Sequence, residues 1–394
     1  MSDRRWTAGD FDYQLPEELI AQVPPARRGD SRLLVVPKGV ILSEARPEAG
    51  RSRRTSAPSN NAAIDARNRG PSTAAAQSAA SAQDDTLQDA TFADLTDLIP
   101  PGDLLVLNST RVRHARLLGR RPSGGPAEVL LVHPSTGDSW IAMGSPGRAM
   151  QPGQRISLGD DVAVETIAVL DNGMRRVQFV GASAAEAMAR FGRMPLPPYI
   201  AREPTADDDD RYQTVYAARE GSVAAPTAGL HLTDQLLDAM RTSGVIVATL
   251  DLEVGPGTFR PMADGDVSRH PMHSERFEIP EALAREVAAC RARSNKVWAV
   301  GTTVVRALES AATDDGAVTA GGADTCLLIV PGFRFRVVDH LITNFHLPRS
   351  TLLMLVAAFA GYEATMAAYR HAVEQRYRFY SYGDAMCVTD SHEP

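Results

Sequence analysis

The second half of the chain alternates between short apolar runs and longer amphipathic stretches. The apolar runs, which are typical of buried strands, lie at 245–254, 297–300 and 325–330. In the stretches 233–244 and 280–294, apolar residues recur instead with the spacing of one face of a helix. Strands that alternate with helices predict an α/β layer.

Residues 112–182 follow a different pattern, in which many short apolar runs are separated by turn signals such as Ser-Gly-Gly, Thr-Gly-Asp and Asp-Asn-Gly. Short, evenly spaced strands of this kind predict a small antiparallel β-barrel. Ser183 and Glu186 then have the spacing of a capping box, so a helix follows the strands and ends near Gly192. We therefore expect a barrel domain at 112–194.

The remaining segments belong to the α/β domain, with a first part at 1–111 and a second part at 195–394. The predicted fold class is an α/β main domain with an inserted small antiparallel β-barrel domain. Within the first part, residues 43–90 contain only Ile64 and Leu87 as large apolar residues. Such a stretch cannot bury enough apolar surface to offset the entropy of ordering. We predict a disordered insertion there, which interrupts a β-hairpin.

Composition and charge narrow the classes of function. The chain has 394 residues, 44% of them hydrophobic, and its net charge of −7 argues against a uniformly basic coat for nucleic acid. A group of arginines between Arg111 and Arg121 can still neutralise phosphates, or can be a solvated edge. Three cysteines stand far apart and signal neither a zinc site nor disulfides. Because no segment reads as a signal peptide or as the roughly 20 apolar residues of a membrane span, we expect a cytoplasmic protein that uses no membrane.

A strand, a glycine and a helix follow one another at 297–310. The free N–H groups of a helix start bind anions such as a carboxylate or a phosphate, and Thr302 and Thr303 lie in that first turn. Arg306 lies on the same helical face as Thr302. The alternative is a capped helix with Arg306 in a structural ion pair.

Two histidines lie at junctions between a loop and a helix. His231 precedes a helix that Thr233 caps, and His346 precedes a helix that Ser350 caps. A neutral imidazole can accept or give a proton near pH 7, so both are acid/base candidates. A structural hydrogen-bonding role is the alternative for each.

The sequence His-Pro-Met-His-Ser-Glu at 270–275 superficially suggests a metal site. Its proline favours an extended turn over a helix, so ligand geometry is not secured and we predict no metal. A polar loop that contacts substrate is the preferred interpretation, with His273 as a further candidate and the Glu275 carboxylate placed to meet an amine.

Three weaker signals remain. The rings of Tyr199, Tyr212 or Tyr216 can stack on a base, although core packing is the usual role of tyrosine. A Gly-Pro-Gly-Thr turn that precedes Arg260 allows a close approach of the backbone to a ligand. The run of aspartates at 207–210 is interpreted as a solvated loop.

Several of these segments have the form of motifs from one enzyme family. They include PTAGLHLT at 226–233, VGPGTFRPM at 254–262, LITNFHLPRSTLLM at 341–354 and YRFYSYGDAM at 377–386. Over most of its length, apart from the insertion, the chain resembles the S-adenosylmethionine:tRNA ribosyltransferase-isomerases, which act late in queuosine synthesis.

The resemblance implies that the ribosyl group of S-adenosylmethionine is transferred and isomerised onto 7-aminomethyl-7-deazaguanine, at the wobble position of a tRNA with a GUN anticodon. Adenine and methionine leave, and epoxyqueuosine remains. S-adenosylmethionine is then a co-substrate, and no cofactor or metal is implied. The catalytic candidates are His231, His346, Glu275 and His273. The candidates for substrate binding are Arg111, Tyr199, Tyr212, Thr227, Arg260, Thr302, Thr303, Arg306, Asn344 and Asp384.

The chain departs from the family pattern at Glu253, which stands where the family has a histidine, and more mildly at His114. If that histidine contacts substrate, the change to a carboxylate alters specificity. Two alternatives therefore stay open. One is a paralogue that modifies a free deazapurine nucleoside or another small amine, and the other is a non-catalytic RNA-binding protein. The oligomeric state is also open, with a monomer as the simplest expectation.

Overall fold

The computed structural model describes residues 5–39, 87–171, 173–255, 262, 267 and 272–390. Among these residues, the larger of two main sheets has nine strands in the order β16-β14-β13-β3-β15-β17-β18-β1-β2. These strands are β1 (Arg32–Pro37), β2 (Gln88–Thr91), β3 (Leu104–Asn108), β13 (Ile246–Leu252), β14 (Glu275–Ile279), β15 (Val297–Val300), β16 (Gly321–Thr325), β17 (His340–Asn344) and β18 (Ala385–Thr389).

The larger sheet is mixed, with a parallel centre. β13, β3, β15 and β17 run parallel to one another, and β18 is antiparallel to β17 but parallel to β1. The strands predicted at 245–254 and 297–300 are thus confirmed as β13 and β15. The α/β class of the main body follows from this sheet and the helices that cover it.

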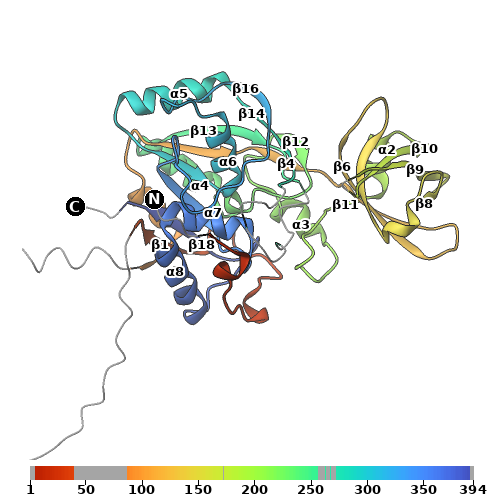
Figure 1. Cartoon of the computed structure of the whole chain (residues 1–394), viewed down its shortest axis with the longest axis horizontal. Helices are drawn as coiled ribbons and strands as arrows, with labels where there is room; N and C mark the ends of the chain where they lie inside the picture. Colours follow the sequence, from red (N-terminus) through yellow and green to blue (C-terminus); the bar gives the residue numbers. More distant parts are fainter. Residues whose placement is uncertain are drawn as a thin grey trace, which may run out of the picture.

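Alternation along the strands divides the core into two layers. Leu34 and Val106 face a cluster that includes side chains of α5 (Glu281–Ala292), α6 (Thr302–Ala311), α7 (Thr351–Ala360) and α8 (Tyr362–Glu374). Leu33 and Leu105, one residue earlier in each strand, face a cluster that includes α1 (Leu95–Leu98) and α4 (Asp234–Thr242). Successive side chains of each strand point to opposite faces of the sheet, and both sets are apolar here. Helices therefore cover both faces of the sheet (Figure 1).

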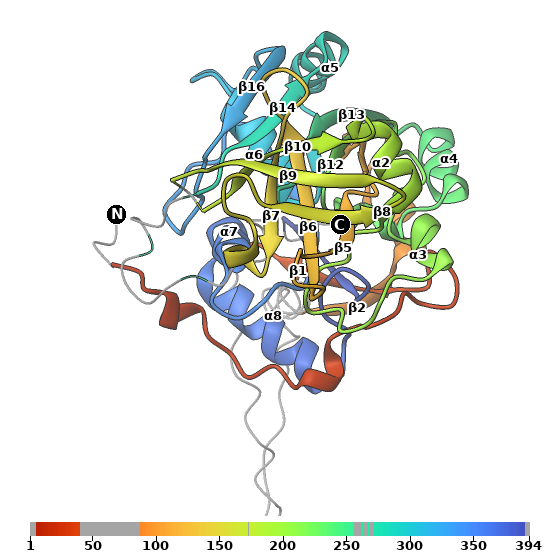
Figure 2. The same cartoon turned by 90° about the vertical axis from the view of Figure 1, so that its right-hand side faces the viewer.

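The second sheet is antiparallel and lies to one side of the main body (Figures 1 and 2). Its strands are β5 (Arg116–Arg120), β6 (Pro126–Pro134), β7 (Trp140–Ser145), β8 (Arg155–Gly159), β9 (Val162–Val169), β10 (Arg175–Val180) and β11 (Gly192–Arg193). A single pairing, Arg120 with Ser157, joins β5 to β8. The closed barrel stays a prediction.

The helix expected after these strands is α2 (Ala184–Phe191), and its capping box is confirmed. Ser183 Oγ accepts from the Glu186 amide at 3.2 Å, and Glu186 Oε2 accepts from the Ser183 amide at 2.8 Å. The chain enters the second sheet through β4 (Thr110–Val112) and returns through β12 (Arg219–Ser222), which pairs with β4 in parallel.

Two predictions about strands need correction. Residues 88–90, assigned to the insertion, belong to β2, which pairs antiparallel with β1 and completes the expected hairpin. The rest of the insertion up to residue 86 lies outside the described residues. The strand predicted at 325–330 is wrong, because β16 ends at Thr325. The side chains of Leu327 and Ile329 pack into the core, but their backbone forms no β-strand. The apolar run therefore indicates burial and does not indicate a strand.

The aspartate run at 207–210 is not a solvated loop. It lies in α3 (Ala206–Arg211), where Asp208 is fully buried. The Asp208 carboxylate accepts from both terminal nitrogens of Arg202, at 2.6 and 2.7 Å, and from the hydroxyl of Tyr382 at 2.7 Å. Burial opposes its ionisation, but the hydrogen bonds from Arg202 and Thr205 hold the pKa of Asp208 below its ordinary value.

No single helix within the described ranges is long and apolar enough to cross a membrane. The pair α7 and α8 passes the same test only when taken together, with a bend of 117° between them.

Replacing Asp208 by Ala is expected to lower the free energy of unfolding by about 3 kcal/mol, because Arg202 and Tyr382 lose a buried partner. The matched control is Asp210→Ala in the same helix, where the side chain is 87% exposed. Urea unfolding measures both variants. Equal losses in the two variants would contradict the account.

Candidate active site

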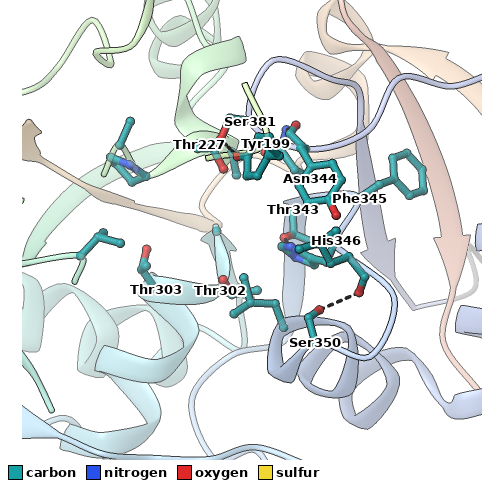
Figure 3. A pocket seen from close by; sticks show the side chains of 18 residues that line it. Tyr199, Thr227, Thr302, Thr303, Thr343, Asn344, Phe345, His346, Ser350 and Ser381 are labelled. Carbon is teal, nitrogen blue, oxygen red and sulfur yellow. Dashed lines mark hydrogen bonds between the residues drawn. The ribbon is translucent and has the colours of Figure 1, made fainter. Parts of the chain in front are cut away.

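A pocket lies at the carboxyl ends of the parallel strands of the larger sheet. Val254, Gly301 and Phe345, which follow β13, β15 and β17, all line it. In open α/β sheets, ligands bind outside the carboxyl ends of the strands. We call this cavity the first pocket (Figure 3).

The start of α6 forms one side of the first pocket. Gly301, with a φ of 95°, follows β15 and turns the chain so that Thr302 and Thr303 face the cavity. Helix N-terminal N–H groups and the helix dipole favour an anion at this point. The predicted anion site is therefore geometrically available, and the side chains of Thr302 and Thr303 border it (Figure 3).

His346 lines the opposite side of the pocket, just beyond the end of β17. Its Nε2 lies 2.8 Å from Thr343 Oγ1, and its backbone N–H donates to the hydroxyl of Tyr369 at 2.9 Å. Burial lowers the pKa of His346 to about 3, so the ring is neutral at pH 7. A neutral imidazole is the form that accepts a proton.

Asn344, the last residue of β17, also lines the first pocket, and it contacts His231 directly. Its Nδ2 lies 3.1 Å from His231 Nε2 and donates to the carbonyl oxygen of Tyr380 at 2.8 Å. His231 ends the 3-10 helix at Thr227–His231 and lies behind Asn344, outside the lining of this pocket. Burial lowers the pKa of His231 to about 3.

The loop before β18 contributes Tyr380 and Ser381 to the lining of the first pocket. Tyr380 lines the pocket with a φ of 72°, an unusual conformation for an aromatic residue. Its ring lies 4.3 Å from that of Tyr199, whose hydroxyl bonds to Ser381. Asp384 ties this loop down by accepting from the backbone amides of Arg32 and Arg378.

A second pocket adjoins the first, and Val254 lines both. It lies between the end of β6 and the strands β13 and β14, and Glu253 and Glu275 line it. Glu275 forms a buried ion pair with Arg306, which therefore lies outside the lining of the first pocket. The ion pair that the sequence offered as an alternative for Arg306 is present.

The other predicted residues that the structure describes lie apart from the first pocket. Arg111 is exposed and donates to the carbonyl oxygen of Ala217 at 3.2 Å. Tyr212 is fully buried and packs edge-on against Tyr382. His273 lies in the loop before β14, and Arg260 is outside the described residues.

The structure also brings to the pocket residues that sequence reasoning did not single out, namely Thr343, Phe345, Tyr380 and Ser381. All four belong to segments that carry the family resemblance, which was the available signal. Thr343 and Phe345 adjoin Asn344 in the sequence, but the meeting of Tyr380 and Ser381 with Asn344 depends on long-range contacts, which no local pattern reveals. Within the described ranges, no group of three or more His, Cys, Asp or Glu side chains is arranged to hold a metal ion.

The buried histidines predict a loss of stability in mild acid. Their folded pKa values of about 3 lie below the ordinary 6.5, so the unfolded chain binds more protons as the pH falls below 6.5. At pH 5 each histidine is expected to cost about 2 kcal/mol relative to pH 7.5.

Chemical unfolding at several pH values measures this effect. The variants His231→Gln and His346→Gln should each flatten the pH dependence, whereas the exposed His133→Gln should keep the wild-type slope. An unchanged slope in both buried-site variants would rule the explanation out.

The profile of a family described as "Queuosine biosynthesis protein" matches residues 8–46 and 74–388. The unmatched stretch 47–73 falls inside the predicted insertion. A protein of Paraburkholderia phytofirmans named S-adenosylmethionine:tRNA ribosyltransferase-isomerase is 45% identical over 389 residues, covering 97% of this chain and 98% of its own. One of the same name from Thiobacillus denitrificans is 46% identical over 380 residues, covering 96% of each chain.

Among solved structures, a crystal structure of an S-adenosylmethionine tRNA ribosyltransferase from Thermotoga maritima is 30% identical, with a TM-score of 0.48 and coverage of 96% of this chain and 99% of that one. The profile match and the near full-length relatives agree on one assignment. The chain belongs to the queuosine biosynthesis protein family.

Proposed function

We propose that this protein transfers and isomerises the ribosyl group of S-adenosylmethionine onto 7-aminomethyl-7-deazaguanine, at the wobble position of a tRNA with a GUN anticodon. Epoxyqueuosine remains in the RNA, and adenine and methionine leave. The observation that carries the proposal is the identity of about 45%, over nearly the whole of both chains, with proteins named for this activity.

The first pocket is our candidate site for S-adenosylmethionine. It is a concave, loop-lined site at the carboxyl edge of the sheet, where small molecules bind in α/β proteins. The start of α6 offers N–H groups to the methionine carboxylate, and the rings of Tyr199 and Tyr380 offer aromatic faces to adenine. S-adenosylmethionine acts here as a co-substrate, and the reaction needs no resident cofactor.

The chemistry needs a base, because the sulfonium acidifies the adjacent 5′ carbon and loss of that proton starts ring opening. His346 is our candidate, because its ring borders the pocket and its Nε2 lies 2.8 Å from Thr343 Oγ1. The amine of the acceptor base then attacks the sugar, and an epoxide forms as sulfur departs. Methionine and adenine leave as separate products.

The second pocket is our candidate site for the acceptor base of the RNA. It adjoins the first pocket through Val254 and carries the carboxylate of Glu253 and the guanidinium of Arg113, whereas Glu275 is paired with Arg306. A carboxylate suits the aminomethyl group, which is a cation at neutral pH, and an arginine suits the RNA backbone. We expect a monomeric enzyme that acts in the cytoplasm, where its tRNA substrate is found.

We also propose that residues 112–194 form a closed barrel domain inserted between the two parts of the α/β domain, at 1–111 and 195–394. Support comes from the Arg120–Ser157 pairing and from a core cluster that includes Leu117, Val129 and Val164 and takes only Val223 from outside this range.

The activity is tested by the release of adenine from S-adenosylmethionine, with and without an anticodon stem-loop that carries 7-aminomethyl-7-deazaguanine. We expect adenine release only with that RNA, together with the mass gain of an epoxycyclopentane. His346→Gln should reduce turnover by about 100-fold or more, as loss of a general base does. The surface variant His371→Gln is the control. No reaction with the modified RNA, beside an active control enzyme, would contradict the proposal.

The barrel proposal is tested with the isolated fragment 112–194. It should show the circular dichroism of antiparallel strands and a cooperative thermal transition, because every member of its core cluster except Val223 lies within the fragment. A fragment that stays unfolded in buffer would show that the second sheet depends on the main body.

A further inference from the structure

We infer that the side-chain oxygen of Asn344 recognises an N–H donor of S-adenosylmethionine, and that His231 and Ser31 are positioning residues that aim this oxygen into the first pocket. The inference deepens the proposed function and rests on it, because it takes S-adenosylmethionine as the ligand of that pocket.

The orientation of the Asn344 carboxamide is fixed by its neighbours. The carbonyl oxygens of Tyr380 and Asp384 lie 2.8 and 3.4 Å from Nδ2, and a carbonyl oxygen only accepts. The amide nitrogen must therefore lie on this side, and Oδ1 on the other. The second hydrogen of the amide points to His231 Nε2, at 3.1 Å.

This contact also determines the state of His231. Since Nε2 accepts from Asn344, the ring carries its proton on Nδ1, which donates to Ser31 Oγ at 2.9 Å. Phe92 stacks on the ring at 4.5 Å between centroids and fixes its plane. A proton on Nε2 would face the amide hydrogens of Asn344, so the arrangement holds His231 as a neutral acceptor.

The side-chain oxygen of Asn344, Oδ1, is available to accept a hydrogen bond from a ligand. The residue is 2% exposed and lines the first pocket, and Oδ1 has no hydrogen-bond partner among the residues that the structure describes. A buried carbonyl oxygen without a donor is costly and rare. A ligand that presents an N–H group to the pocket supplies the missing donor.

S-adenosylmethionine carries two kinds of N–H donor, namely the α-ammonium of its methionine part and the exocyclic amine of its adenine. Both are of the class that Oδ1 accepts. Analogues that lack one donor at a time tell the two sources apart.

The test measures the equilibrium affinity of the full-length protein for S-adenosylmethionine, for its desamino analogue and for an analogue with purine in place of adenine. Asn344→Leu should weaken binding of S-adenosylmethionine by roughly 10- to 100-fold. Asn295→Leu, which removes a carboxamide near Asp103 and away from the pocket, is the control and should bind as the wild type does.

The penalty of Asn344→Leu should vanish for the one analogue that lacks the recognised donor. Equal penalties for all three ligands, or no penalty for S-adenosylmethionine, would overturn the inference. The wild-type protein alone also tests the inference. It should bind one of the two analogues about tenfold or more weakly than S-adenosylmethionine.

Two variants separate positioning from proton transfer at His231. Gln keeps an acceptor near the place of Nε2, and Leu removes it at similar volume. His231→Gln should therefore retain turnover within about threefold, whereas His231→Leu should lose about tenfold in affinity for S-adenosylmethionine. Loss of turnover by His231→Gln at full occupancy would overturn the positioning role.

Nitrogen chemical shifts of ¹⁵N-histidine in the wild type give an independent readout. His231 should show the neutral tautomer with hydrogen on Nδ1 from pH 5 to pH 8, and a titration in that range would contradict the geometry. Failure of the proposed function itself looks different, because the wild type would then release no adenine with the modified RNA.

Discussion

The site depends on the hydrogen bonds of one buried carboxamide, that of Asn344. This residue ends β17, and its amide nitrogen joins the helical turn that carries His231 and the loop of Tyr380 and Asp384. Three segments that are distant in sequence thereby meet at one point on the carboxyl edge of the sheet. Each bond replaces one that water would make, so the junction is stable only when all of its members are in place.

The same principle recurs around the pocket, where buried polar groups tie down loops instead of facing solvent. Asp384 holds the backbone of Arg32 and Arg378, and Asp208 holds Arg202 and Tyr382. A buried charge is costly unless its partners are arranged around it, so these contacts specify one loop conformation. Rigid walls of this kind let a loop-built pocket hold a ligand in a defined geometry.

Features governed by local chemistry could be predicted from the sequence, and features governed by distant partners could not. The capping box at Ser183, the helix after Gly301 and the strand β13 depend on neighbours in sequence, and they are present as expected. The helix at Asp208 has a local signal in its capping box with Thr205, but the burial of Asp208 could not be predicted, because the hydroxyl of Tyr382 comes from 174 positions away. The six predicted residues that line the first pocket came largely from family motifs; these residues are Tyr199, Thr227, Thr302, Thr303, Asn344 and His346.

The proposed function requires that the cavity between the start of α6 and the end of β17 hold S-adenosylmethionine. A crystal structure of the protein with S-adenosylmethionine bound, in the absence of RNA, tests it most directly. The account predicts the methionine carboxylate at the amides of Thr302 and Thr303 and a ligand nitrogen within hydrogen-bond distance of Asn344 Oδ1. Ligand density in the second pocket, with the first pocket empty, would contradict it.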